Sequence, residues 1–198
     1  MLFKVVYMKK NMNVVIVHGC NDNEEDGLER PKENERHWKP WLKKELENHG
    51  IDVSNELYPR DWDADYGEWK KVFEKNKIDE NTILVGHSCG GAFLVRWLSE
   101  TNQKIKKLIL VAPAKRLPGM KEKYLKFYTF KPNEKVKNNI GEIVIFVSND
   151  ESPGIKKAVE LYKQELNAKV IELKNHGHFT LGDMGTEEFP ELLEEILK

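Results

Sequence analysis

Ser88 lies in the segment GHSCG (86–90), whose G-x-S-x-G pattern is one in which a serine hydroxyl can act as a nucleophile. The pattern alone is weak evidence, because a glycine-rich turn with an incidental serine has the same letters. The apolar run TILV before it predicts a buried strand, and GAFLVRWL after it predicts a helix. A sharp turn between the two would hold the hydroxyl above the sheet, where the helix N-terminus favours the negative charge that develops during attack.

A nucleophilic serine needs a base and an acid that orients the base. On parallel sheets of this type the chain order is serine, acid, histidine. Asp150 and Glu151 follow the apolar run IFVS, and His176 and His178 follow the last predicted strand. Because the carboxyl ends of parallel strands meet at one edge of a sheet, we expect these side chains to lie near Ser88.

Acyl transfer also needs N–H donors for the oxyanion that develops on the substrate. One is expected from the residue after the nucleophile, Cys89, and the other from Cys20, in the loop that follows the strand VIVHG. A backbone N–H survives truncation of its side chain, so we expect alanine at either position to preserve substantial activity. A zinc site built from His18, Cys20 and Cys89 is the alternative, but their spacing does not match a structural zinc site. We expect no metal and no organic cofactor, and we expect His18 to shape its turn rather than to do chemistry.

Short β-rich runs alternate with amphipathic stretches along the chain. This alternation predicts a mostly parallel sheet with helices on both faces, in a single domain that spans residues 1–198. Two polar or aromatic connections, residues 20–36 and 114–141, are long for such a pattern. Strands are expected at 13–19, 51–59, 82–87, 106–113, 142–148 and 168–173, and helices over 37–50, 66–73, 89–98, 155–166 and 187–198.

The charge and hydropathy of the chain limit the kinds of partner that we expect. The chain of 198 residues has 32 basic and 33 acidic residues, and no basic block, so we expect no nucleic-acid partner. No apolar run approaches the roughly 20 residues that span a bilayer, and we expect no signal peptide in the first residues, whose apolar stretch is too short. The two cysteines form neither a zinc motif nor the disulfide framework of a small secreted domain. We therefore expect a cytoplasmic protein without a membrane partner.

Several segments together resemble a known family. They are VIVHG followed by HWKPWLKKEL, then VGHSCGG, KLILVAP, VSNDES and HGHF, and their order along the chain is the same. They resemble the small serine hydrolases of the retinoblastoma-binding protein 9 and YdeN type. The resemblance implies an α/β-hydrolase fold with little or no lid and a Ser–Asp–His triad. It implies that Ser88 is the nucleophile and that His178, the histidine of GHF, is the base, whereas His176 has no counterpart in that role.

The acid departs from the family pattern. The family has its acid in S-x-x-D-P, and this chain has Ser148-Asn149-Asp150-Glu151-Ser152 instead. Residue type favours Asp150, because aspartate is the commoner triad acid, and the spacing from Ser148 favours Glu151. Only one of two neighbouring side chains in a turn can reach the imidazole, so we expect one to be buried against His178 and the other to face solvent.

The residues favour a serine hydrolase that cleaves small carboxylic esters through an acyl-enzyme on Ser88. Thioesters and peptides are alternative substrates of the same chemistry. A protein-binding module with vestigial hydrolysis is a further alternative, because fold does not fix function and some members of the family are described by their binding partners.

Overall fold

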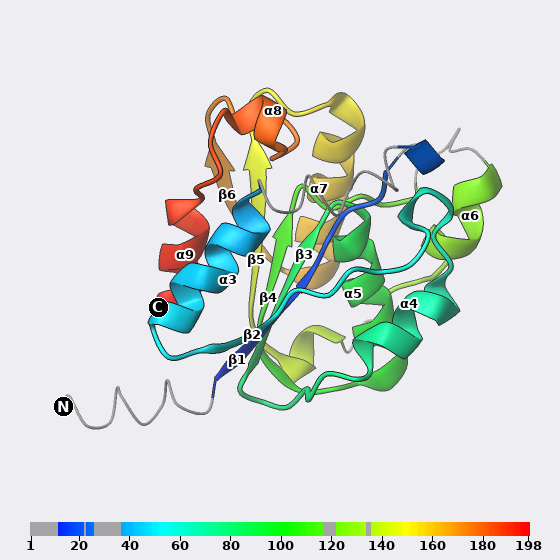
Figure 1. Ribbon diagram of the computed structural model, residues 1–198. Coiled ribbons are helices and arrows are strands. Elements are labelled where there is room, and N and C mark those ends of the chain that lie inside the picture. The colour runs from blue at the N-terminus through cyan, green and yellow to red at the C-terminus, as the bar shows by residue number, and fades with distance from the viewer. Residues whose placement is uncertain (1–11, 22, 26–36, 117–121, 134–135) are drawn as a thin grey trace.

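The computed structural model describes residues 12–21, 23–25, 37–116, 122–133 and 136–198. Within these residues, six strands form one sheet in the order β2-β1-β3-β4-β5-β6, and every neighbouring pair is parallel (Figure 1). All carboxyl ends therefore lie at the same edge. The strands are β1 (Asn13–Val17), β2 (Asp52–Ser54), β3 (Thr82–His87), β4 (Ile105–Val111), β5 (Ile140–Ser148) and β6 (Lys169–Leu173).

Helices cover both faces of the sheet, as the alternating pattern predicts (Figure 1). Helices α3 and α9 pack on one face, and α4 to α7 pack on the other. None of the helices in the described residues is long and apolar enough to cross a membrane. The helices are α3 (Trp38–Asn48), α4 (Tyr66–Phe73), α5 (Cys89–Thr101), α6 (Glu122–Tyr128), α7 (Pro153–Leu166), α8 (Leu181–Met184) and α9 (Pro190–Leu197), and two 3₁₀ turns are η1 (Asp61–Asp63) and η2 (Val136–Asn139).

The central strand β3 shows why these residues form this sheet. All six of its residues are buried, because a strand with helices on both faces has no side exposed to water. Ile83 and Val85 pack into the core under α3 and α9, and Leu84 packs into the opposite core. This alternation matches the two-residue period of a strand. The core thus fixes the register of β3 and brings Ser88, directly after it, to the carboxyl edge of the sheet.

Three predicted strands run at least two residues past the observed ends, and the one expected at 106–113 ends at Val111. The strand expected at 51–59 pairs with β1 only over β2, Asp52–Ser54, because β2 is an edge strand and the chain then leaves the sheet. The strand expected at 13–19 ends at Val17, so His18 and Gly19 begin a loop. The expectation of little or no lid concerns the two long connections, and residues 22, 26–36, 117–121 and 134–135 of these lie outside the described residues.

Candidate active site

Ser88 occupies a sharp turn between β3 and α5. Its backbone has φ 51° and ψ −118°, a conformation that is costly for a residue with a side chain. The turn is held by hydrogen bonds: the Ser88 N–H donates to the Val111 carbonyl at 2.9 Å, and the Ser88 carbonyl accepts from Ala114 N–H at 3.0 Å. Ser88 stands at the N-cap of α5, yet its hydroxyl makes no capping bond. A serine in this position normally caps the helix. Here the turn leaves the hydroxyl available to other groups.

Glycines permit the close packing around this turn. A Cβ built on Gly86 would lie 2.7 Å from the Gly91 Cα, a distance shorter than real Cβ atoms show. A Cβ on Gly90 would collide with the carbonyl of His18, so the start of α5 lies directly against the end of β1. The pattern of glycines around the serine is therefore a packing requirement of this strand-to-helix turn.

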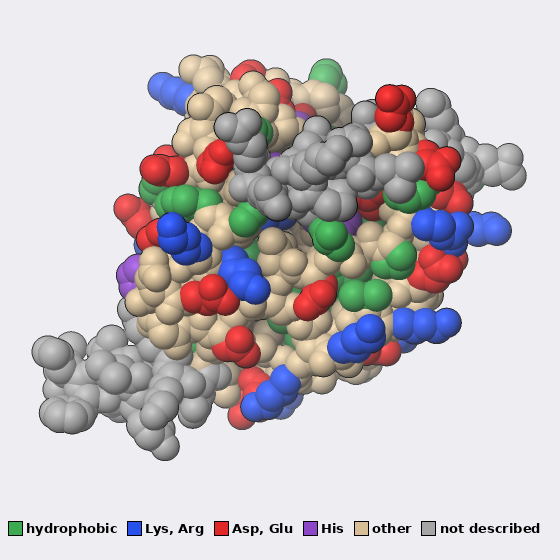
Figure 2. All heavy atoms as spheres, viewed as in Figure 1, with side chains coloured by type: hydrophobic (Ala, Val, Ile, Leu, Met, Phe, Trp, Pro, Cys, Tyr) green, Lys and Arg blue, Asp and Glu red, His purple; other side chains and the backbone are tan. Residues whose placement is uncertain are grey.

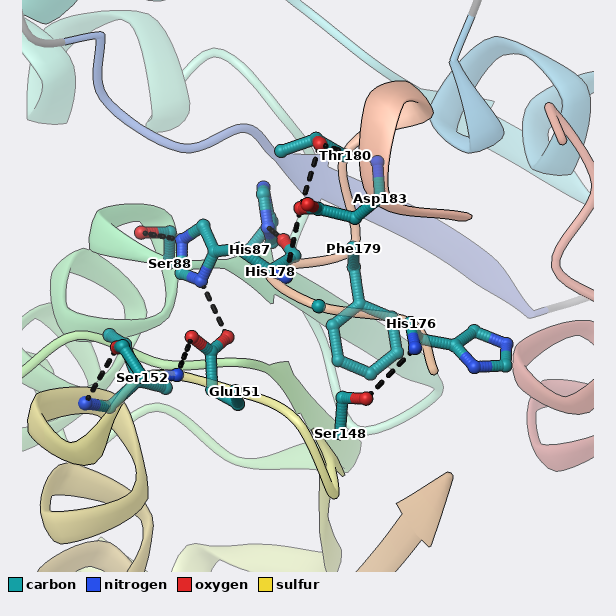
Figure 3. A network of polar contacts seen from close by, with 12 residues as sticks. His87, Ser88, Ser148, Glu151, Ser152, His176, His178, Phe179, Thr180 and Asp183 are labelled. Carbon is teal, nitrogen blue, oxygen red and sulfur yellow. Dashed lines mark hydrogen bonds and ion pairs between the residues drawn. The ribbon is translucent and has the colours of Figure 1, made fainter. Parts of the chain in front are cut away.

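His178 connects Ser88 to Glu151 (Figure 3). Its Nδ1–H donates to Glu151 Oε2 at 2.7 Å, and its Nε2 accepts from the Ser88 hydroxyl at 3.0 Å. The Glu151 side chain is 3% exposed and the His178 side chain 32% exposed. The carboxylate is thus shielded from water, while the imidazole is partly exposed and Ser88 is half-buried. This arrangement can move a proton from the hydroxyl to the imidazole, with the carboxylate holding the ring.

The Glu151 carboxylate is stabilised in its charged form. Burial by itself raises its pKa, but hydrogen bonds from His178 and from the Ser152 N–H, the latter at 2.6 Å, outweigh burial and bring the net pKa below the usual range. Glu151 also lies just before the N-terminus of α7, where the helix dipole favours a negative charge. The carboxylate is therefore ionised at neutral pH.

Asp150, the other acid considered in the sequence, does not contact His178. Its side chain is exposed, and it accepts hydrogen bonds from the Ser148 hydroxyl and from the Gly177 N–H, the latter at 3.0 Å. The Ser148 hydrogen bond lowers its pKa. The two neighbouring acids therefore differ as expected. Glu151 is buried against the imidazole. Asp150 faces solvent and holds the backbone of the loop that carries His176 and His178, which we call the histidine loop.

Further groups fix the backbone of this loop. The His178 N–H donates to Asp183 Oδ2 at 2.9 Å, and the His178 carbonyl accepts from His87 Nε2–H at 2.8 Å (Figure 3). One residue further, the Phe179 carbonyl accepts from the indole N–H of Trp38 at 2.9 Å. Burial lowers the pKa of His87 well below its ordinary value, so this ring is neutral. These contacts set the position of the His178 ring through its backbone.

His18 shapes the loop that follows β1. Its Nε2 accepts from the Tyr58 N–H at 2.8 Å, so its Nδ1 carries the proton and donates to the Gly19 carbonyl at 2.7 Å. In a trans peptide the N–H points opposite to the carbonyl, so the Cys20 N–H is directed away from His18. A Cβ on Gly19 would lie 3.1 Å from the Ser88 Cβ, so this peptide lies beside the nucleophile turn. The Cys89 N–H, at the first position of α5, has no intrahelical acceptor.

Cys20 and Cys89 form a disulfide, whereas the sequence analysis treated them as two separate cysteines. The signal for this pairing was present in the sequence, since both residues were expected on the two sides of one small site. In the described part of the chain, no group of three or more His, Cys, Asp or Glu side chains is arranged to hold a metal ion.

Sequence reasoning also missed Asp183 and Trp38. Asp183 is five residues from His178, where Thr180 caps the short helix α8 and also donates to the Asp183 carboxylate. The string T-x-x-D is a capping pattern and could have indicated this turn. Trp38 is 141 residues from its acceptor, Phe179, and no local pattern signals that contact.

Known proteins share sequence and fold with this chain. The chain is 29% identical to the serine hydrolase RBBP9 of Rattus norvegicus over 163 residues, which cover 80% of this chain and 84% of that protein. It is also 29% identical to YdeN of Bacillus subtilis, a protein named as a hydrolase, over 167 residues that cover 78% of this chain and 83% of YdeN. The crystal structure of YdeN has the same fold, with a TM-score of 0.77 at 23% identity, and the match covers 94% of this chain and 97% of YdeN.

The family resemblance stated from the sequence motifs is thereby confirmed, and so is the α/β-hydrolase fold. The sequence profile of the serine hydrolases matches residues 14–197, nearly the whole chain. The chain belongs to the serine hydrolase family.

Proposed function

We propose that this protein hydrolyses small carboxylic esters through an acyl-enzyme on Ser88. The observation that carries the proposal is the hydrogen-bonded series from the Ser88 hydroxyl through His178 to the buried Glu151. A serine, a histidine and a carboxylate in this order are the parts that nucleophilic acyl transfer requires.

In the first half of the reaction, His178 Nε2 takes the proton of the Ser88 hydroxyl as the oxygen attacks the ester carbonyl. The imidazolium that forms is stabilised by Glu151, whose low pKa keeps it charged throughout. The N–H groups of Cys20 and Cys89 stabilise the negative charge on the former carbonyl oxygen. His178 then gives its proton to the departing alcohol, and the acyl group remains on Ser88.

In the second half, a water molecule takes the place of the alcohol. His178 removes a proton from this water, which attacks the acyl carbon and releases the carboxylic acid. The 32% exposure of the His178 side chain fits this step, because water must reach Nε2. The proton returns to Ser88 and the site is restored. Ser88, His178 and Glu151 complete this cycle with water as the only co-reactant.

Esters are the substrates that such a site attacks most readily, because an alkoxide or phenolate leaves more easily than an amine. On the visible face, Lys and Arg lie beside Asp and Glu (Figure 2). The substrate that we propose is a small neutral acyl ester. Thioesters remain substrates of the same chemistry.

The test is a series of p-nitrophenyl esters from acetate to long acyl chains, assayed with the wild-type protein and with Ser88→Ala. We expect turnover that is greatest for short chains, and loss of that turnover by a factor on the order of 10⁴–10⁶ in Ser88→Ala. The variant should unfold at the same temperature as wild type, which excludes loss of structure. Absence of turnover across esters, thioesters and peptides in the wild-type protein would contradict the proposal and favour a binding role.

A further inference from the structure

A disulfide joins the two residues whose backbone N–H groups receive the oxyanion in the proposed function. Cys20 lies in the loop after β1, and Cys89 is the first residue of α5. Their Cα atoms are 5.7 Å apart, although 69 residues separate them in the sequence. The role inferred for this bond rests on the proposed function, because it concerns the same site.

The two linked residues are held very differently. Cys89 is 1% exposed and begins a helix whose first turn is packed against the end of β1. Cys20 is partly exposed and lies outside any strand or helix. Its orientation relative to Cys89 is held on one side by the hydrogen bond from His18 to the Gly19 carbonyl, and on the other side by the disulfide. The disulfide is thus the covalent link between a firmly held oxyanion donor and one on a loop.

We propose that the Cys20–Cys89 disulfide positions the two oxyanion donors, and that its reduction lowers the rate of ester hydrolysis. The cysteines act as positioning residues through their backbone N–H groups, and their sulfur atoms do not touch the substrate. The expectation from the sequence, that truncation of either side chain preserves substantial activity, is revised accordingly. Truncation keeps the N–H but removes the link that orients it.

The chemistry is an ordinary thiol–disulfide exchange with a small thiol or a dithiol reductant. A thiolate attacks the Cys20 sulfur, the more exposed of the two, and the Cys89 thiolate leaves and takes up a proton. A second thiol then attacks the mixed disulfide, releases the Cys20 thiol and forms the oxidised reductant. Two electrons pass from the two external thiols to the protein, and a small-molecule disulfide reverses the reaction.

The effect should appear in kcat rather than in KM. Oxyanion donors act on charge that exists only in the transition state, so weakening them changes kcat with little effect on substrate binding. Removing one donor outright costs roughly 10²–10³ in kcat in other serine hydrolases. Reduction leaves the donor in place but no longer holds its orientation, so the loss in kcat should be smaller, about 10- to 100-fold. Such a site would be most active where disulfides persist and attenuated where thiol pools keep cysteines reduced.

The experiment compares oxidised and reduced wild-type protein with p-nitrophenyl acetate as substrate. A phosphine reductant is used, since thiols cleave this ester themselves, and the freed thiols are counted by iodoacetamide labelling and mass spectrometry on a separate portion. We expect kcat to fall about 10- to 100-fold when two thiols per chain appear, with KM changed less than about threefold. Reoxidation with glutathione disulfide should restore kcat.

The double variant Cys20→Ala/Cys89→Ala is the matched control, because it keeps both N–H groups and lacks the link. We expect its kcat to equal that of the reduced wild type and to be unaffected by the phosphine. Unchanged kcat in protein with two free thiols would overturn the inference but leave the proposed function standing. Loss of the far-ultraviolet circular dichroism signal on reduction would also overturn it, because the bond would then hold the whole fold. An inactive oxidised protein would instead count against the proposed function.

Discussion

Two buried glutamates lie at opposite ends of the sheet and have different partners. Glu151, at the carboxyl edge, contacts the imidazole of His178 at 2.7 Å. Glu195, on α9, contacts Lys107 at 2.9 Å and Lys198 at 3.0 Å, near the amino ends of the strands. Their residues are 6% and 1% exposed. Both carboxylates are therefore removed from water, and both need a partner to remain charged.

The partners determine what each carboxylate can do. Burial alone would raise the pKa of Glu195, but the hydrogen bonds from Lys107 and Lys198 lower it to about 2. Burial lowers the pKa of Lys107, but its hydrogen bonds to Glu142 and Glu195 outweigh burial and raise the net pKa, so this ion pair stays charged at neutral pH and serves structure. The partner of Glu151 is an imidazole, which can take a proton from the Ser88 hydroxyl and return it during a reaction. The same residue type thus supports chemistry at one end of the sheet and the packing of α9 at the other.

The largest expected effect separates two histidines of one loop. His178→Ala should lower kcat by a factor on the order of 10⁴–10⁶, because the Ser88 hydroxyl loses its base. His176→Ala is the matched control: its ring contacts the Lys174 carbonyl and Phe179 and does not join the series to Ser88. It should cost less than about tenfold. Steady-state kinetics with p-nitrophenyl acetate measures both, and an inactive His176→Ala with an active His178→Ala would reverse the assignment of the base.

The next effect separates the two neighbouring acids. Glu151→Gln should lower kcat by roughly 10³–10⁴, because a neutral amide stabilises neither the correct tautomer nor the imidazolium. Asp150→Asn keeps an oxygen that can accept from the Gly177 N–H, so a loss of less than about tenfold is expected. The kcat values of the two purified variants show which carboxylate is the triad acid. Equal losses would mean that Asp150 contributes to the reaction through more than the loop it holds.

The smallest effect on activity belongs to Glu195, whose replacement should instead affect stability. Glu195→Gln removes one of the two carboxylates that pair with the buried Lys107 and leaves Glu142, at 2.8 Å, as the other, so the free energy of unfolding should fall by about 1–3 kcal/mol. Turnover at 25 °C should stay within about twofold, because the cluster is remote from Ser88. The exposed neighbour Glu194 supplies the control, and Glu194→Gln should change the free energy of unfolding by less than about 0.5 kcal/mol. Urea unfolding measures both values.

The pH dependence of the stability difference between wild type and Glu195→Gln gives a second readout. The folded pKa of Glu195 is about 2 and the unfolded value about 4.3, so the folded state binds the proton less well. The stabilisation is fully present above about pH 5 and is lost as the pH falls toward 2. Wild type and Glu195→Gln should therefore converge in stability across this interval. A difference that stays constant between pH 6 and pH 3 would show that the charge of Glu195 is not the cause.

Much of the fold could be predicted because its signals are local. The apolar run TILVGH has a buried strand's composition, and α3 carries Trp38, Leu42 and Leu46 on one face. Ser88 and His178 follow predicted strands, and parallel topology brings those ends together. The choice between Asp150 and Glu151 could not be made from residue type, because it depends on the direction of each side chain in the turn.

Contacts between distant segments were the least predictable part of the site. The disulfide joins residues 69 positions apart, and this spacing matches no cysteine pattern from which a disulfide could be predicted. The contact of Trp38 with the Phe179 carbonyl likewise depends on how α3 packs against the histidine loop. Such contacts follow from the assembled layers rather than from any local pattern, although both ends of the disulfide had been placed at one site.

The central claim is that the Ser88 hydroxyl is the nucleophile, and covalent trapping tests it most directly. The wild-type protein is treated with a fluorophosphonate, digested, and analysed by tandem mass spectrometry until the modified residue is located. We expect one phosphonyl group per chain, on Ser88, with loss of ester hydrolysis in proportion to labelling. Labelling should fall sharply in His178→Ala and Glu151→Gln. A phosphonyl group on another residue, or full inactivation with Ser88 unmodified, would show that Ser88 is not the nucleophile.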